Sequence, residues 1–389
     1  MFTDVFLQMI FGFGALMLFI TEYGMSSMAF CFLITAIAFQ WSIFTDGFFN
    51  CVYSNTWDTL PLDIVVLINA LYAVAAVLIT FGAVIGKTTP LQLVVLTMME
   101  LVFFSFNRMF MMLGVFNLQD AGCSIITHLF GAYFGVGVSL ALGSPKAQIP
   151  TPGYLSDVLS MFGMIMLVAY YPSFNAGTLD VDSDEAQRAI VNTVISLFSA
   201  TTVSFATSSL MSADGKFRAV DIQNGPIAGG VVIGVVANLS LAPYTISILG
   251  MIAGFVSTFG FNKIQPYLEQ TIGLHDSCGV HNLHGMPAII GGLASVVIAA
   301  YKNSEGRAAD SAIYGPDGGS QWWKQLLGVV VTLGIGLAGG GCTGWVMRYF
   351  FEPAASSSYA KYMYKDSAWF SGSFASTGSS SSTTAREDL

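Results

Sequence analysis

Residues 120–140 read DAGCSIITHLFGAYFGVGVSL, an aspartate followed by an almost unbroken apolar run that contains one histidine, His128. About eleven apolar stretches of this kind, each roughly 16 to 30 residues long, are near or above the length that crosses the ~30 Å hydrocarbon core of a bilayer as a helix. They lie near residues 5–20, 24–45, 62–86, 90–111, 121–143, 155–171, 188–210, 224–240, 243–261, 275–301 and 322–351.

The composition agrees with a membrane protein. Hydrophobic residues make up 54% of the chain and charged residues 10%, with a mean hydropathy of +0.67, whereas a soluble domain carries about 25% charged residues. Long helical stretches argue against an outer-membrane barrel, whose strands alternate over about ten residues. We therefore expect an all-α polytopic bundle at 1–351, followed by a Ser/Thr-rich tail at 352–389 whose end should be disordered.

The positive charges favour one orientation. With the amino terminus outside, more lysines and arginines fall on the cytoplasmic side, which also receives the carboxy terminus. The cytoplasmic set is Lys87, Lys146, Lys216, Arg218, Lys263, Arg348, Lys361, Lys365 and Arg386, and the outer set is Arg108, Arg188, Lys302, Arg307 and Lys324. The outer face is then acidic overall, which is either a solubilising surface or a mouth that concentrates small cations.

His128 is the first candidate functional residue. An imidazole can pass a proton or a hydrogen bond without a permanent charge, and ionisable groups at membrane depth point to function. Asp120 lies eight residues earlier, ~12 Å along a helix, so it should sit near the outer surface. The structural alternatives are a helix cap for Asp120 and an interhelical hydrogen bond without a transport role for His128.

The second candidate segment, residues 275–292, reads HDSCGVHNLHGMPAIIGG. His281 and His284 are three residues apart, a spacing that places them on one helix face. Their alternatives are an interhelical hydrogen bond or a metal site with His275, Asp276 and Cys278, although one segment offers no coherent ligand set and lacks the zinc-protease glutamate. No nucleophile–base set is visible, so we expect neither an enzyme nor a cofactor. An inverted duplication of about five helices would place His128 on the fifth helix and His281 on the tenth.

Together with YYPSFNAG, LINALYAVAAVLITFGAVIGKTTPLQL, DIQNGPIAGGVVIG and PYTISILGMIAGFVSTFGF, these two segments resemble the Rh glycoprotein branch of the ammonium transporter family, in family order and from about residue 3 to 350. The resemblance implies a homotrimer with one pore in each subunit. It implies that His128 and His281 share a hydrogen bond across the pore, with His284 adjacent. Asp120 matches the family's aspartate at the outer end of the fifth helix. The aromatic gate matches Phe174 and Tyr72, and Asn175 follows as a vestibule or structural residue.

Three departures from the family pattern bear on function. Tyr72 stands where relatives usually have phenylalanine. Arg108 follows Asn107 where Rh proteins often carry an acidic vestibule residue. Animal Rh glycoproteins have a further helix before the first stretch, so this chain has eleven helices or is a shortened form of a longer one.

The expected function is transport of ammonium or ammonia, with ammonium deprotonated at the outer vestibule and ammonia conducted past two histidines. Carrying a bare ammonium ion through a dry pore would cost several kcal/mol or more in desolvation. The alternatives are a non-conducting ammonium sensor or scaffold subunit and a carbon dioxide channel. We expect membrane lipid but no nucleic acid as a partner, and location in the plasma membrane.

Overall fold

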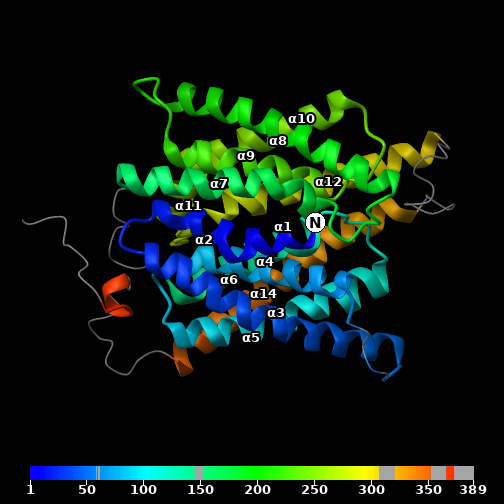
Figure 1. Cartoon of the computed structure of the whole chain (residues 1–389), viewed down its shortest axis with the longest axis horizontal. Coiled ribbons are helices and arrows are strands. Elements are labelled where there is room, and N and C mark those ends of the chain that lie inside the picture. Colours follow the sequence, from blue (N-terminus) through cyan, green and yellow to red (C-terminus); the bar gives the residue numbers. More distant parts are fainter. Residues whose placement is uncertain (58, 60–61, 145–151, 306–319, 352–364, 372–389) are drawn as a thin grey trace, which may run out of the picture.

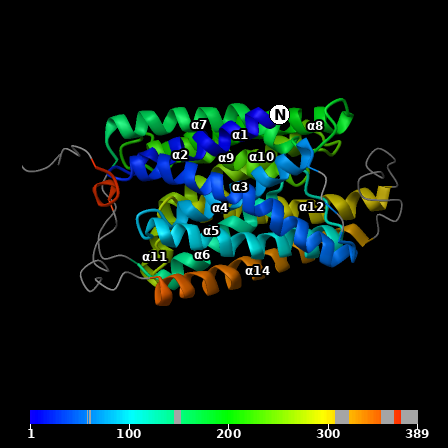
Figure 2. The same cartoon turned by 60° about the horizontal axis from the view of Figure 1, so that its bottom comes forward.

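The computed structural model describes the chain except residues 58, 60–61, 145–151, 306–319, 352–364 and 372–389. Every regular element in the described part is helical, and the long helices lie roughly side by side along a common direction (Figures 1 and 2). This confirms the all-α polytopic bundle. The predicted disorder at the end of the tail concerns residues outside the described part.

Ten helices in the described part are long and apolar enough to cross a bilayer. Five are continuous: α3 (Gly24–Ser54), α4 (Ile64–Val84), α7 (Tyr154–Asn175), α8 (Asp184–Met211) and α14 (Gln321–Phe350). The other five are built from successive elements: α1 (Phe2–Leu7), η1 (Gln8–Gly12), α2 (Phe13–Leu16) and η2 (Met17–Phe19); α5 (Pro90–Ser105) and η3 (Phe106–Phe116); η4 (Ser124–Leu129) and α6 (Phe130–Leu142); α10 (Pro243–Phe259), η5 (Gly260–Ile264) and α11 (Gln265–Ile272); η6 (His281–Gly285) and α12 (Met286–Glu305).

The eleventh apolar stretch forms the shorter helix α9 (Ala219–Gly234). It begins and ends about five residues earlier than the apolar pattern predicts. Its polar start is kept in the helix because the Asp221 carboxylate is buried and accepts hydrogen bonds from Ser208 Oγ at 2.8 Å and Asn262 Nδ2 at 3.0 Å. Its end is fixed because the Val235 N–H donates to Ser124 Oγ at 2.7 Å.

The centre of the bundle is formed by α4, α6 and α9, whose residues are buried almost throughout. Small residues allow close contact where lipid gives no hydrophobic drive to association. A Cβ at Gly340 of α14 would lie 2.1 Å from the carbonyl oxygen of Phe134 in α6, and one at Gly131 would lie 2.6 Å from that of Ala76 in α4. These two glycines therefore set how closely the helices on either side approach α6.

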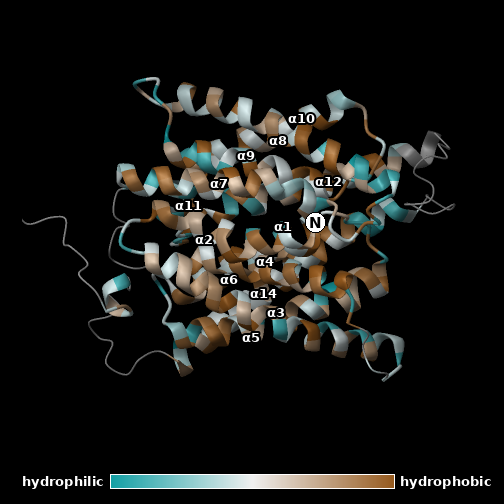
Figure 3. Ribbon diagram, in the orientation of Figure 1, coloured by the Kyte–Doolittle hydropathy of each residue, from teal (hydrophilic) through white to brown (hydrophobic). Residues whose placement is uncertain are grey.

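The outside of the bundle is apolar along its middle. Hydrophobic residues dominate the central part of the helices, and hydrophilic residues gather toward the two ends (Figure 3). Large side chains such as Phe32, Phe44, Phe162 and Val297 are exposed on the surface. An apolar belt of this kind fits hydrocarbon, in which only helices with internally paired backbones are stable.

Two equivalent backbone contacts relate the halves of the chain. The N–H of Gly122, two residues after Asp120, donates to the Gly234 carbonyl at the end of α9, at 2.8 Å. The N–H of Cys278, two residues after Asp276, donates to the Gly82 carbonyl near the end of α4, at 2.9 Å. The expected inverted duplication therefore has a direct counterpart in the structure.

A short piece of the expected tail lies against the bundle. Asp366, in η10 (Asp366–Ala368), accepts hydrogen bonds from the N–H groups of Met25 and Ser26, each at 2.8 Å, and so caps α3. Lys365 pairs with Glu22 at 2.6 Å, and the ring of Phe370 lies 5.7 Å from that of Phe30. The chain from 365 to 371 is thus part of the folded bundle rather than of a free tail.

Candidate functional site

Two buried imidazoles face each other at the centre of the bundle. His128 lies in η4 and His284 in η6, and their Nδ1 atoms are 3.2 Å apart. The two ring planes are almost parallel, with an interplanar angle of 5° and centroids 5.2 Å apart. His128 is 2% and His284 4% exposed. The pair joins the two halves of the chain through one hydrogen bond.

The prediction that His128 pairs with His281 is wrong. The ring of His281 packs edge-on against Tyr133 with centroids 5.7 Å apart, and its backbone N–H donates to Asp276 Oδ2 at 2.9 Å. Although His281 and His284 lie three residues apart in the π-helix η6, they contact different residues, Tyr133 and His128 respectively. A sequence signal did exist, because Asp276 precedes His284 by eight residues, as Asp120 precedes His128.

Asp120 and Asp276 cap the two histidine-bearing helices. Asp120 accepts from the N–H groups of Ser124, Ile125 and Ile126, each at 2.8 Å. Asp276 accepts from Val280 and His281 at 3.0 and 2.9 Å. Burial raises the pKa of Asp120 to about 7 against the opposing effect of the three N–H groups, and burial also raises the pKa of Asp276. The geometry gives both residues the structural role of a helix cap.

An aromatic pair lies directly beside His128. The rings of Tyr72 and Phe174 have centroids 4.7 Å apart, and the Phe174 ring lies 5.4 Å from His128. Tyr72 fits where relatives carry phenylalanine because its hydroxyl donates to the Phe174 carbonyl at 2.6 Å. Asn175 is buried, and its Nδ2 donates to Thr193 Oγ1 at 2.9 Å. Asn175 therefore holds α7 against α8.

A narrow cavity of about 10 Å³ lies in front of the histidine pair, close to the smallest volume that holds one water-sized molecule. Its lining joins the pair to the aromatic residues and is formed by Gln8, Phe13, Leu16, His128, Leu167, Tyr171, Phe174, Ile227, Leu283 and His284. Gln8 is 2% exposed, and within the described part of the chain its Nε2 has no hydrogen-bond partner. Sequence analysis missed Gln8, although a glutamine inside an apolar stretch is a visible signal.

Tyr171 is a second residue that sequence analysis missed. Its hydroxyl lies 3.1 Å from His128 Nε2, and the planes of the two rings make an angle of 20°. On the other side of the pair, Phe13 lies against His284 with centroids 6.3 Å apart and an interplanar angle of 15°. Neighbouring rings among Tyr171, His128, His284 and Phe13 are therefore nearly parallel.

Arg108 is neutralised by a neighbour. Its guanidinium pairs with the carboxylate of Asp46, and both side chains are largely buried, with exposures of 9% and 15%. They line a cavity of about 250 Å³ together with Asn50 and Asn69. The arginine that departs from the family pattern therefore adds no net charge when Asp46 is ionised.

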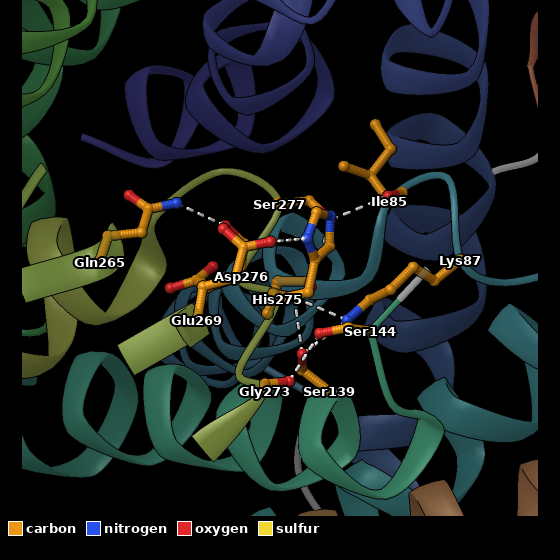
Figure 4. Close-up of polar contacts among 11 residues, drawn as sticks. Ile85, Lys87, Ser139, Ser144, Gln265, Glu269, Gly273, His275, Asp276 and Ser277 are labelled. Carbon is orange, nitrogen blue, oxygen red and sulfur yellow. Dashed lines mark hydrogen bonds and ion pairs between the residues drawn. The ribbon is translucent and has the colours of Figure 1, made fainter. Parts of the chain in front are cut away.

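A polar cluster around Lys87 and His275 lies at the end of the bundle away from Arg108 (Figure 4). Lys87 Nζ donates to Ser139 Oγ and, at 2.6 Å, to the carbonyl of His275. The Nδ1 of His275 lies 2.8 Å from Glu269 Oε1. Burial lowers the pKa of Lys87 to about 7, against the attraction of Asp276 and Glu269, and burial also lowers the pKa of His275. The cluster ties the loop after α4 to α6 and to the segment that precedes η6.

The histidines of the second segment have separate partners. His275 contacts Glu269, His281 contacts Tyr133, and His284 contacts His128. Among the described residues, no group of three or more His, Cys, Asp or Glu side chains converges on a point where a metal ion could bind. The geometry therefore gives no support to the metal-site alternative.

Comparison with known proteins gives consistent matches. The family model described as Ammonium Transporter Family matches residues 1–367. Ammonium transporter Rh type B of Danio rerio is 38% identical over 359 residues, which cover 89% of this chain and 77% of the relative. Ammonium transporter Rh type B of Sus scrofa is 38% identical over 376 residues, covering 93% and 81%.

Among solved structures, Nitrosomonas europaea Rh50 superposes with a TM-score of 0.76 at 31% identity, covering 89% of this chain and 86% of that one. Candida albicans Mep2 superposes with a TM-score of 0.69 at 18% identity, covering 94% and 85%, which shows a common fold.

Proposed function

Because the chain belongs to the ammonium transporter family, whose model it matches over residues 1–367, we propose that it transports ammonium by conducting neutral ammonia along the His128–His284 pair. The observation that carries this mechanism is the position of the pair. Two facing imidazoles lie buried directly behind the Tyr72–Phe174 aromatic pair and line a cavity with room for one small molecule.

The physical argument concerns the charge of the solute. Moving ammonium into an apolar passage costs several kcal/mol or more of desolvation, whereas neutral ammonia avoids most of that cost. Ammonium therefore gives up its proton on the outer side of the Tyr72–Phe174 pair. Within the passage, the imidazole nitrogens and the Gln8 amide supply hydrogen-bonding partners that carry no charge.

Recruitment of ammonium belongs to the outer face. The acidic residues that the orientation places there raise the local concentration of small cations. Arg108 does not oppose this attraction, because its charge is balanced by Asp46. Asp120 acts on the passage indirectly, by capping the helix that carries His128.

Further features follow the family resemblance and are part of the proposal. The protein forms a homotrimer with one passage in each subunit and resides in the plasma membrane. The amino terminus lies outside and the carboxy terminus, with the docked segment around Asp366, lies in the cytoplasm. This orientation places the Lys87 cluster at the inner end.

The test is ammonia-driven alkalinisation of proteoliposomes that contain a trapped pH dye. We expect faster alkalinisation than in empty liposomes after addition of an ammonium salt. Equal rates would contradict conduction and favour the sensor or scaffold alternative. A carbon dioxide jump on the same vesicles checks the third alternative, and acidification faster than in empty liposomes would show that the passage also conducts that gas.

A further inference from the structure

Tyr171 adds a third member to the histidine pair. Its hydroxyl contacts His128 Nε2 at 3.1 Å, while His128 Nδ1 contacts His284 Nδ1 at 3.2 Å. The planes of neighbouring rings are nearly parallel, with angles of 20° and 5° between them. Such geometry places the hydroxyl and the ring nitrogens in one continuous hydrogen-bonded chain.

The two ends of this hydrogen-bonded chain of side chains differ. At the His284 end, the place that corresponds to Tyr171 is taken by Phe13, whose ring lies at 15° to that of His284. A phenylalanine ring offers no hydroxyl. The two histidines are therefore chemically unequal, although the backbone around them is nearly symmetric.

The inequality fixes where the protons lie. A neutral imidazole has one N–H and one bare nitrogen. The hydrogen bond between the two facing Nδ1 atoms needs one of each, so one Nδ1 carries the hydrogen and the other is bare. If the Tyr171 hydroxyl donates to His128 Nε2, then His128 is protonated on Nδ1 and donates to His284 Nδ1. His284 must then carry its own proton on Nε2.

The reverse arrangement is less stable. Each arrangement leaves one donor over, the His284 Nε2 N–H when Tyr171 donates and the Tyr171 O–H when it accepts. The contact between Tyr171 and His128 decides between them. A bare imidazole nitrogen is a good acceptor and a phenol oxygen a poor one, so the O–H to N hydrogen bond is stronger than the N–H to O bond of the reverse arrangement.

We propose that Tyr171 is a positioning residue that sets the tautomers of the His128–His284 pair and thereby its preference for ammonia over ammonium. The proposal rests on conduction along this pair. With Tyr171 donating, both bare nitrogens are occupied, that of His128 by the hydroxyl and that of His284 by the His128 N–H. The pair is left with a donor, the N–H of His284 Nε2.

This arrangement discriminates between the two forms of the solute. Ammonia has a lone pair and accepts a hydrogen bond from the His284 N–H. Ammonium has four N–H groups and no lone pair, so it needs an acceptor, and neither ring offers a free one. An ion that entered would therefore find no acceptor on either imidazole, in a passage lined mostly by apolar side chains, which is costly for a charged group.

The test compares Tyr171→Phe with Tyr170→Phe, its neighbour on α7, in proteoliposomes. Tyr171→Phe keeps the ring but frees His128 Nε2 as an acceptor and lets the tautomers interchange. We expect the current that follows an ammonium jump to rise about tenfold over wild type, as for one newly available buried hydrogen-bond partner. The ratio of this current to the rate of ammonia-driven alkalinisation should therefore rise in Tyr171→Phe, and Tyr170→Phe should keep the wild-type ratio.

Nitrogen NMR of histidine-labelled protein in bilayers supplies a readout that packing alone would not move. In wild type, His128 should show a protonated Nδ1 and a bare Nε2, and in Tyr171→Phe the two tautomers should mix. Wild-type currents and an unchanged spectrum in Tyr171→Phe would overturn the proposal, as would complete loss of alkalinisation in that variant. Wild-type alkalinisation no faster than that of empty liposomes would instead remove the conduction on which the proposal rests.

Discussion

Asp120 and Asp276 occupy equivalent positions, each accepting backbone N–H groups four and five residues further along the chain and each preceding a histidine of the central pair by eight residues. The residue two positions after each aspartate donates its N–H to a helix carbonyl, Gly122 to Gly234 at the end of α9 and Cys278 to Gly82 near the end of α4. The two caps therefore place His128 and His284 opposite each other by repeating one local structure.

Replacing either cap by asparagine should destabilise the protein. Asparagine offers one acceptor oxygen in place of two charged ones, so at least one buried N–H of η4 or η6 loses its partner, at about 1–3 kcal/mol. We expect Asp120→Asn and Asp276→Asn each to lower the Tm in detergent, measured by intrinsic fluorescence. Asp63→Asn is the matched control, because Asp63 caps α4 at an exposed site, where asparagine is an equally good cap. A loss in the control as large as in the two variants would contradict the argument.

The sequence predicted the bundle because about twenty consecutive apolar residues are needed to span hydrocarbon, and this requirement is visible without any tertiary information. It also predicted His128, Phe174 and Tyr72 as neighbours, through the family resemblance. The choice of His281 failed because the resemblance was carried onto the first histidine of HNLHG, whereas the second one, His284, lies against His128. Gln8 and Tyr171 were missed because their significance depends on which side of a helix faces the cavity, which tertiary packing decides.

The buried pair Arg108–Asp46 should behave as a unit. Removing one partner leaves a buried charge without compensation and costs about 3–5 kcal/mol. We expect Arg108→Gln and Asp46→Asn each to lower the Tm strongly, and the double variant to recover most of the loss. Urea or thermal unfolding of the three variants measures the coupling. Additive losses in the double variant would show that the two side chains act independently.

Gln8 should reduce stability while serving transport. Its Nε2 is buried without a partner among the described residues, and relief of such a group is worth about 1–3 kcal/mol. We therefore expect Gln8→Met, which has a similar volume, to raise the Tm and to slow ammonia-driven alkalinisation. A higher Tm with unchanged flux would remove Gln8 from the mechanism and leave it as a packing residue.

Stability should depend on pH through Lys87. Its pKa is lowered from 10.5 to about 7 in the folded protein, so between these values the unfolded chain binds the extra proton and folding is favoured as pH rises. As pH falls from 10.5 this contribution is lost progressively, and the loss is complete near pH 7, below which both the folded and the unfolded chain bind the proton. We expect the Tm of wild type, measured relative to that of Lys87→Met, to rise from pH 7 to pH 9. A difference that is constant over this range would contradict the lowered pKa.

The central claim is that ammonia passes along His128 and His284, and His281 provides the matched control because it lies three residues away with its ring against Tyr133. Stopped-flow alkalinisation of proteoliposomes containing His128→Ala, His284→Ala or His281→Ala tests the claim most directly. The account predicts that the first two variants lose most of the ammonia flux above that of empty liposomes, while His281→Ala retains it. Wild-type flux in His284→Ala, with loss in His281→Ala, would contradict it.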